Sequence, residues 1–270
     1  MDATLTLNDG KTIPRLGLGV YQATGGDEVI AVRHALDHGY RHIDTAAMYD
    51  NEVGVGQAVA DSGVPRDDIF ITTKVWNERI RRGETTAALD ESLQKLGVDR
   101  VDLMLLHWPV DGRVQAWEEL ITAQQDGRAT SIGVSNFMPE HLDEIISATG
   151  VVPVINQVEY HPWNEPDDII AGSKQHGMAM EAWSPLMRGR LAEEPVLVEL
   201  AGELGRTEAQ VALRWLLQKD VVVIPKSVTP SRIESNAELF DFELDEAAMA
   251  RIDGIKGHGR LGPDPANFNF

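Results

Sequence analysis

The stretch that decides the fold lies within residues 70–106, which read FITTK at 70–74, TTAALDESLQKLG at 85–97 and VDLMLL at 101–106. The outer two segments are short and apolar, which is typical of buried strands. The middle segment is amphipathic and is followed by Gly97, the residue type that most easily adopts the left-handed conformation at a helix C-terminus. A strand, a helix and a strand in this order predict two parallel strands joined by a crossover helix.

The same alternation of short apolar runs and amphipathic stretches continues along the chain. The predicted strands are residues 17–20, 41–43, 70–74, 101–106, 130–134, 154–158, 178–182 and 221–224. The predicted helices are residues 27–38, 52–62, 85–96, 114–126, 139–148, 167–176, 207–218 and 232–240. Thr207 and Gln210 have the spacing of a capping box at the start of one of them. Eight strands that alternate with eight helices predict an α/β fold, the (β/α)8 TIM barrel.

Two terminal segments stand outside this pattern. LTL at 5–7 and KTI at 11–13 flank NDG at 8–10, and Asp-Gly favours a tight turn, so residues 1–14 predict a β-hairpin. Residues 257–270 are rich in Gly and Pro and predict a loop, whose Phe268 and Phe270 we expect to pack against the rest of the protein. Because no low-complexity linker divides the chain, residues 1–270 predict a single domain.

Composition excludes several classes of function. The chain of 270 residues has 24 Lys and Arg against 43 Asp and Glu, a formal charge of −19, and no cysteine. Disulfides, thiolate nucleophiles and cysteine-ligated zinc are therefore excluded. The acidity argues against nucleic-acid and anionic-membrane partners, which require a positive face. Without a basic and apolar leader in residues 1–10, or an apolar run of about 18–20 residues, the expected localisation is cytoplasmic.

The common nucleotide-binding loops are absent from the sequence. GLG at 17–19 and GVG at 54–56 begin a Rossmann fingerprint, but Gln22 and Val59 occupy the positions of the third glycine. A P-loop is also absent, because Leu5 takes the place of its first glycine ahead of the Gly-Lys pair at 10–11.

Polar and aromatic residues follow seven successive predicted strands. In a (β/α)8 barrel the carboxyl ends of the strands open on one mouth, where the chemistry takes place. The residues at these ends are Asp44 with Tyr49 beyond it, Lys74, His107, Ser135 with Asn136, Gln157, Trp183 with Ser184, and Lys226 with Ser227.

Four of these residues form a coherent chemical set. Tyrosine has a reference pKa of about 10, so it is a poor proton donor at neutral pH without help. A buried ammonium from Lys74 would lower the pKa of Tyr49, and Asp44 would keep that lysine charged and oriented. His107 can hydrogen-bond a carbonyl oxygen and fix its position. The set suits protonation of a carbonyl group while a cofactor delivers hydride, and it suits hydrolysis poorly because it has no activated nucleophile.

Longer motifs surround these residues and carry a family resemblance. GYRHIDTA at 39–46 is followed by Tyr49, by Asn51-Glu52 and by Gly56. LLHWP at 105–109, IGVSNF at 132–137 and IPKS at 224–227 come later in the chain. Together these segments resemble the aldo-keto reductase signature over nearly the whole chain. Within the family the likeness is greatest to the short bacterial 2,5-diketo-D-gluconate reductases.

The resemblance implies an activity and a catalytic set. It implies NADPH-dependent reduction of an aldehyde or ketone, sugar-derived or a small dicarbonyl. Tyr49 would be the general acid, Asp44 and Lys74 would tune it, and His107 would orient the substrate. Two connecting loops, 109–114 and 185–194, are short, which predicts an open substrate pocket. The residues expected to form the pocket walls are Tyr21, Trp76 and Trp108.

The resemblance also implies the NADPH/NADP+ contacts, which are Ser135, Asn136, Gln157, Trp183, Ser184, Leu186, Lys226, Ser227, Arg232 and Asn236. In the family pattern the first three hold the nicotinamide carboxamide, and Trp183 stacks on the ring. Lys226, Ser227 and Arg232 match positions that grip the adenosine 2′-phosphate, which favours NADPH over NADH. Asn236 matches an adenine contact, although Ser235 stands where many relatives have a glutamate. We therefore expect Lys226 and Arg232 to form a local positive patch.

Several other hypotheses compete with this one. The same barrel could be a non-catalytic module that binds and senses the cofactor, and the intact catalytic set argues against this. His34 and His38 have the i,i+4 spacing of a metal-binding pair, but without a third ligand we predict no metal site. GVS at 133–135 begins a nucleophile elbow, but Phe137 replaces its last glycine. The arginines at 79, 81 and 82 predict a solvated loop. The expected partner is a small carbonyl substrate, and the family default is a monomer.

Overall fold

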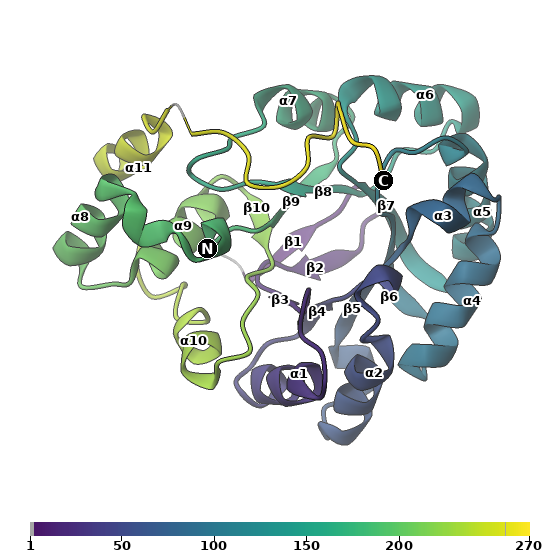
Figure 1. Cartoon of the computed structure of the whole chain (residues 1–270), viewed down its shortest axis with the longest axis horizontal. Coiled ribbons are helices and arrows are strands. Elements are labelled where there is room, and N and C mark those ends of the chain that lie inside the picture. The colour runs from purple at the N-terminus through teal and green to yellow at the C-terminus, as the bar shows by residue number, and fades with distance from the viewer. Residues whose placement is uncertain (1–2, 257) are drawn as a thin grey trace.

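The fold is a closed barrel of eight parallel strands surrounded by helices (Figure 1). The computed structural model describes residues 3–256 and 258–270; Met1 and Asp2 of the predicted hairpin segment and Gly257 of the predicted tail lie outside the described residues. The strands, which pair in chain order, are β3 (Leu18–Gly19), β4 (His42–Asp44), β5 (Phe70–Val75), β6 (Val101–Leu106), β7 (Ala129–Ser135), β8 (Ile155–Glu159), β9 (Ala179–Trp183) and β10 (Val221–Val223). The predicted (β/α)8 barrel is confirmed.

The barrel closes between its first and last strands. The amide of Val223 donates to the carbonyl oxygen of Arg15 at 2.9 Å, and the amide of Gly19 donates to that of Pro225 at 3.2 Å. A Cβ atom on Gly19 would lie 2.9 Å from the carbonyl oxygen of Ile224. This seam therefore requires a glycine, because any side chain at position 19 would push the two strands apart.

The helices form the outer layer of the barrel. The eight predicted helices correspond to α1 (Asp27–Asp37), α2 (Glu52–Asp61), α4 (Thr85–Leu96), α5 (Arg113–Gln125), α6 (Pro139–Thr149), α7 (Asp167–Gln175), α9 (Glu208–Gln218) and α10 (Pro230–Ser235). The capping box of Thr207 and Gln210 is present. The prediction for α10 was wrong at both ends, because Pro230 begins the helix and the chain leaves it at Ser235 rather than continuing to residue 240.

Among the described residues, three further α-helices were not predicted: α3 (Asn77–Arg81), α8 (Pro195–Leu204) and α11 (Glu246–Asp253). The first corrects the prediction of a solvated loop at the arginines. Arg79 lies 3.1 Å from Glu84, so an ion pair links α3 to the turn that precedes the next helix, α4. Within the described residues no helix is both long enough and apolar enough to cross a membrane.

The N-terminal hairpin lies across one end of the barrel. Its strands, β1 (Thr4–Thr6) and β2 (Thr12–Pro14), pair antiparallel as predicted (Figure 1). Ile13 and Leu7 are buried in a cluster with Leu103, Ile155 and Val222 of the barrel strands. The hairpin thus fills one end with apolar side chains and leaves the polar residues to the other.

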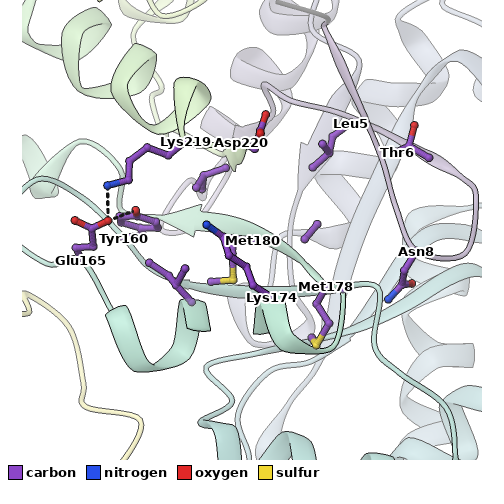
Figure 2. Close-up of a pocket in the computed structure, with 14 residues that line it drawn as sticks. Leu5, Thr6, Asn8, Tyr160, Glu165, Lys174, Met178, Met180, Lys219 and Asp220 are labelled. Carbon is purple, nitrogen blue, oxygen red and sulfur yellow. Dashed lines mark hydrogen bonds and ion pairs between the residues drawn. The ribbon is translucent and has the colours of Figure 1, made fainter. Parts of the chain in front are cut away.

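A hollow of about 260 Å³ lies between this hairpin and the beginnings of β9 and β10 (Figure 2). It contains none of the predicted site residues. Three of its polar side chains pair with one another. Tyr160 Oη donates to Glu165 Oε1 at 2.8 Å, and the Lys219 ammonium contacts Glu165 and lies 3.0 Å from Asp253 Oδ1. This hollow is therefore separate from the polar mouth at the carboxyl ends of the strands.

Candidate active site

A buried lysine joins the first residues of the polar mouth. Lys74 on β5 is fully buried, and its Nζ donates to Asp44 Oδ1 of the neighbouring strand β4 at 2.7 Å and to the carbonyl oxygen of Thr45 at 2.8 Å. The same Nζ lies 3.5 Å from Tyr49 Oη, which the short 3-10 turn Ala47–Tyr49 places above it. Adjacent parallel strands and one turn thus bring together Asp44, Tyr49 and Lys74, three of the four predicted catalytic residues.

The electrostatics of this group correct one expectation. Burial raises the pKa of Tyr49 to about 12, and the Lys74 charge only partly opposes that rise. The predicted net lowering of the Tyr49 pKa was therefore wrong for this structure, because desolvation of the phenolate outweighs its attraction to the ammonium. Burial alone would lower the pKa of Lys74. Interactions with Asp44 and Tyr49 raise this pKa by more than burial lowers it, so the net shift is upward and the ammonium stays charged. Tyr49 thus keeps its proton at neutral pH beside a fixed positive charge.

His107 completes the predicted set of four. It follows β6, it is buried, and its ring stands edge-on to those of Tyr49 and Trp76 at centroid distances of 5.8 and 5.1 Å. Burial, with a contribution from the Lys74 charge, holds the pKa of His107 well below its usual range, so the imidazole is neutral. Its Nδ1 is buried without a hydrogen-bond partner among the described residues. A buried neutral imidazole of this kind is suited to hydrogen-bonding a ligand.

A second carboxylate, which the sequence analysis missed, lies beneath the first. Gln157 on β8 donates from Nε2 to Asp44 Oδ2 and to Glu181 Oε2 of β9, both at 2.8 Å. Burial, together with repulsion from Asp44, raises the pKa of Glu181 to about 8. Glu181 stands two residues before Trp183 in the same strand, so period-two alternation puts both on one face. That spacing was the available signal for an inward-facing acid.

We expect the Glu181→Gln variant to change how stability depends on pH. A carboxyl group whose pKa rises on folding binds more protons in the folded than in the unfolded protein between its two pKa values. The wild type should therefore lose stability relative to the variant as the pH rises from about 4.3 to the folded-state pKa of about 8, and the difference should be constant above that. Urea unfolding at a series of pH values measures this. A stability difference that does not vary with pH would show that folding does not raise the pKa of Glu181.

A hydrogen-bond network extends from this core toward the expected cofactor residues. Asn136 Nδ2 donates to the carbonyl oxygen of His107 at 3.1 Å and to Ser135 Oγ at 2.9 Å, while Asn136 Oδ1 accepts from Trp183 Nε1 at 2.9 Å. Ser135 Oγ donates to the carbonyl oxygen of Gln157 at 2.7 Å. The structure therefore brings Ser135, Asn136, Gln157 and Trp183 into one array beside the catalytic set. Ser184 and Leu186 follow Trp183 in the loop after β9 and are partly buried.

The remaining predicted cofactor residues lie after β10. Ser227 and Asn236 are buried, whereas Lys226 and Arg232 are exposed on the loop and on α10. Across residues 3–256 and 258–270, neither of these two cations has a carboxylate within 4.0 Å. Both positive charges are thus available to an anion on a protein whose formal charge is −19.

The C-terminal tail covers part of the predicted substrate pocket. Tyr21 is exposed and its ring centroid lies 5.0 Å from that of Tyr49, as a pocket wall requires. Trp76 is partly buried and lies parallel to Phe270 at 5.9 Å. Trp108 is only 5% exposed, because Phe268 and Phe270 pack on it at 4.9 and 5.1 Å. In this structure Trp108 therefore backs the tail rather than lining an open pocket, and the predicted packing of the two phenylalanines is confirmed.

Hydrogen bonds from two side chains to the backbone of this tail hold it in place. The buried Glu159 accepts from the amides of Leu261 at 2.6 Å and Gly262 at 3.0 Å. Further along, Arg81 Nη2 donates to the backbone oxygen of Phe270 at 2.7 Å. Gly262 lies so close to Trp183 that a Cβ atom there would be 2.4 Å from the indole ring. The tail therefore packs against Trp183 as well as covering part of the predicted substrate pocket.

Comparison with known proteins identifies the family. The model of the aldo/keto reductase family matches residues 15–256. The chain belongs to this family. It is 46% identical to the methylglyoxal reductase DkgA of Escherichia coli (strain K12), over 98% of this chain and 97% of that protein. This chain is therefore an NADP-dependent oxidoreductase.

Solved structures of similar proteins agree with the fold. A mutant of Gox0644 in complex with NADPH has a TM-score of 0.94 and 40% identity, with all of both chains covered. A putative 2,5-diketo-D-gluconic acid reductase B has a TM-score of 0.93 and 37% identity, covering 98% of this chain and 96% of that one. The likeness of this aldo-keto reductase to the 2,5-diketo-D-gluconate reductases, predicted from its motifs, is confirmed.

Proposed function

We propose that this aldo-keto reductase reduces an aldehyde or ketone with NADPH and that Tyr49 donates the proton. The observation that carries the proposal is the position of a protonated Tyr49 hydroxyl 3.5 Å from the charged Lys74 ammonium. As the hydroxyl releases its proton, the ammonium stabilises the phenolate that forms. Asp44 holds the ammonium in place at 2.7 Å. The neutral His107 hydrogen-bonds the carbonyl oxygen and directs it toward Tyr49.

The residues around the set fit a nicotinamide cofactor. When bound, this cofactor supplies the hydride. The amides of Asn136 and Gln157 and the hydroxyl of Ser135 are the groups that match a carboxamide, and Trp183 offers a ring for stacking. Lys226 and Arg232 provide two exposed cations for the 2′-phosphate, which favours NADPH over NADH.

The substrate class follows from the walls and from the relatives. Tyr21 and Trp76 offer aromatic surface beside Tyr49 and His107. Relatives named methylglyoxal reductase and 2,5-diketo-D-gluconic acid reductase support a small or sugar-derived dicarbonyl. Oxidation of NADPH should be followed with methylglyoxal, 2,5-diketo-D-gluconate and a simple aldehyde. Turnover of at least one dicarbonyl in preference to the simple aldehyde is expected, whereas NADPH binding without turnover of any carbonyl would point to a cofactor-sensing module.

We expect the Lys226→Ala variant to weaken discrimination between the two cofactors. A hydrogen bond to a charged group contributes about 1.5–3 kcal/mol, so the KM for NADPH should rise roughly 10- to 100-fold. The KM for NADH, which has no 2′-phosphate, should change little. Lys174→Ala is the matched control, since that lysine lines the separate hollow beside the hairpin. An unchanged ratio of the two KM values in Lys226→Ala would remove Lys226 from the phosphate site.

A further inference from the structure

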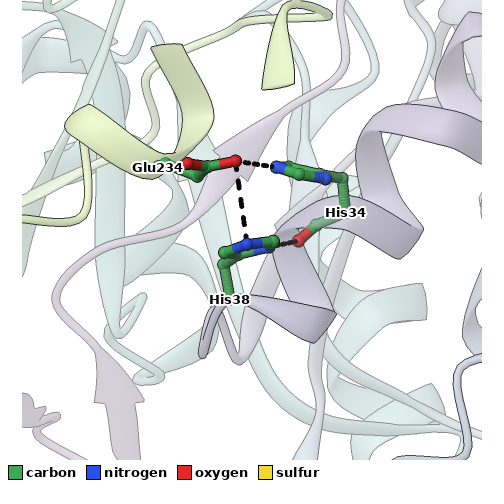
Figure 3. Close-up of side chains that lie close together, drawn as sticks. All are labelled: His34, His38 and Glu234. Atoms are coloured by element: carbon green, nitrogen blue, oxygen red, sulfur yellow. Dashed lines mark hydrogen bonds and ion pairs between the residues drawn. The ribbon is translucent and has the colours of Figure 1, made fainter. Parts of the chain in front are cut away.

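Three metal-ligating side chains converge where α1 meets α10 on the outside of the barrel (Figure 3). His34 lies in the last turn of α1, His38 is the residue that follows this helix, and Glu234 reaches them from α10. His34 Nε2 lies 2.8 Å and His38 Nε2 lies 3.7 Å from the same oxygen, Glu234 Oε1. One ligand atom of each residue lies within 4.8 Å of the other two. The third ligand that the sequence did not reveal is therefore present.

The orientation of His38 is already fixed as in a metal ligand. Its Nδ1 lies 2.7 Å from the carbonyl oxygen of His34, so Nδ1 carries the hydrogen and donates it. In the neutral ring this leaves the lone pair on Nε2, the nitrogen that faces Glu234. Metal-bound histidines commonly donate their second ring N–H to a backbone carbonyl in this way. The two imidazole rings stack with their centroids 4.1 Å apart.

We propose that His34, His38 and Glu234 form a surface site for a zinc-class divalent cation. Two imidazoles and one carboxylate form a known zinc ligand set, with water in the fourth position. Tetrahedral coordination at about 2.0–2.2 Å separates ligand atoms by roughly 3.4 Å, so the separations of 2.8 and 3.7 Å need only small side-chain adjustments. The formal charge of −19 also favours cation binding. The magnesium ion, which prefers oxygen ligands in an octahedron, does not fit this set.

Zinc binding at this site requires a change of tautomer at His34. A carboxylate only accepts hydrogen bonds, so His34 Nε2 carries the hydrogen in its contact with Glu234. When the metal ion binds Nε2, the hydrogen of the neutral ring moves to Nδ1 and no proton leaves the protein. The bound ion would tie α10 to α1.

Isothermal titration of tag-free protein with ZnCl2 tests the proposal. We expect saturable binding. His38→Ala and Glu234→Gln should each weaken it by roughly tenfold or more. His176→Ala is the matched control, since His176 pairs with Asp143 at 3.1 Å in another surface contact. MgCl2 should not compete.

Three results would overturn the zinc site: no saturable Zn²⁺ binding, equal affinity in the wild type and both ligand variants, or an equal loss in the His176→Ala control. Thermal unfolding with and without ZnCl2 supplies a second measurement, in which zinc should raise the Tm of the wild type and of His176→Ala only. Neither experiment depends on NADPH or a carbonyl substrate, so each tests the zinc site independently of the proposed reaction.

Discussion

The Tyr49→Phe variant is expected to lose activity by roughly 10²- to 10⁴-fold in kcat while it still binds NADPH, because a positioned general acid contributes about that much. Phenylalanine keeps the ring that packs against Tyr21 and His107 and removes only the hydroxyl. Burial raises the Tyr49 pKa to about 12, so the wild-type hydroxyl remains protonated throughout the neutral range. Steady-state kinetics with a dicarbonyl and fluorescence titration with NADPH measure the two effects.

Tyr160→Phe is the matched control for this variant. Tyr160 also has a hydroxyl in a hydrogen bond, to Glu165 at 2.8 Å, but it lines the hollow beside the N-terminal hairpin. Its loss should cost only about 1 kcal/mol of stability and leave kcat unchanged. If Tyr49→Phe retained kcat within a few-fold of the wild type, another residue would be the proton donor.

Replacement of Lys74 by methionine is expected to reduce both stability and activity. The substitution leaves the Asp44 carboxylate buried without its ammonium partner and beside Glu181, linked to it only through Gln157. Removal of one partner from a buried ion pair costs about 3–5 kcal/mol in the free energy of unfolding. The phenolate of Tyr49 would also lose its stabilising charge, so kcat should fall by at least about 10²-fold. Urea unfolding and steady-state kinetics test the two losses.

A double variant separates the two roles of Lys74. With Asp44→Asn added to Lys74→Met, the unpaired buried charge is gone, so much of the stability should return while activity stays low. Recovery of activity together with stability would mean that Lys74 acts only as a structural ion-pair partner. Normal stability and kcat in the single variant would contradict the electrostatic account of the site.

Much of the barrel was predictable because local sequence encodes it. Short apolar runs between glycine-terminated amphipathic stretches specify alternating strands and helices, and parallel pairing follows from the crossovers. Polar residues such as Asp44, Lys74 and His107 stand out at strand ends in an otherwise apolar pattern. The carboxyl ends of the strands in a parallel barrel meet at one mouth, so the sequence alone predicts that the candidate catalytic residues lie together.

The rest depends on contacts between distant segments, which local pattern does not encode. Nothing next to Glu181 in the sequence shows that it is buried, or that Gln157 hydrogen-bonds both Glu181 and Asp44. Glu234 meets His34 across a separation of 200 residues, and Arg81 meets Phe270 across 189. The pKa of Tyr49 depends on the degree of burial, which residue types alone do not give, and its direction was therefore predicted wrongly.

Transfer of deuterium from NADPH that carries deuterium in place of both hydrogens at the nicotinamide C4 position tests the central claim most directly. The wild type should place one deuterium on the former carbonyl carbon of a dicarbonyl substrate, with stoichiometric oxidation of the cofactor, and mass spectrometry of the alcohol product detects it. Bound NADPH with no label transferred to any carbonyl tested would contradict catalysis by this aldo-keto reductase.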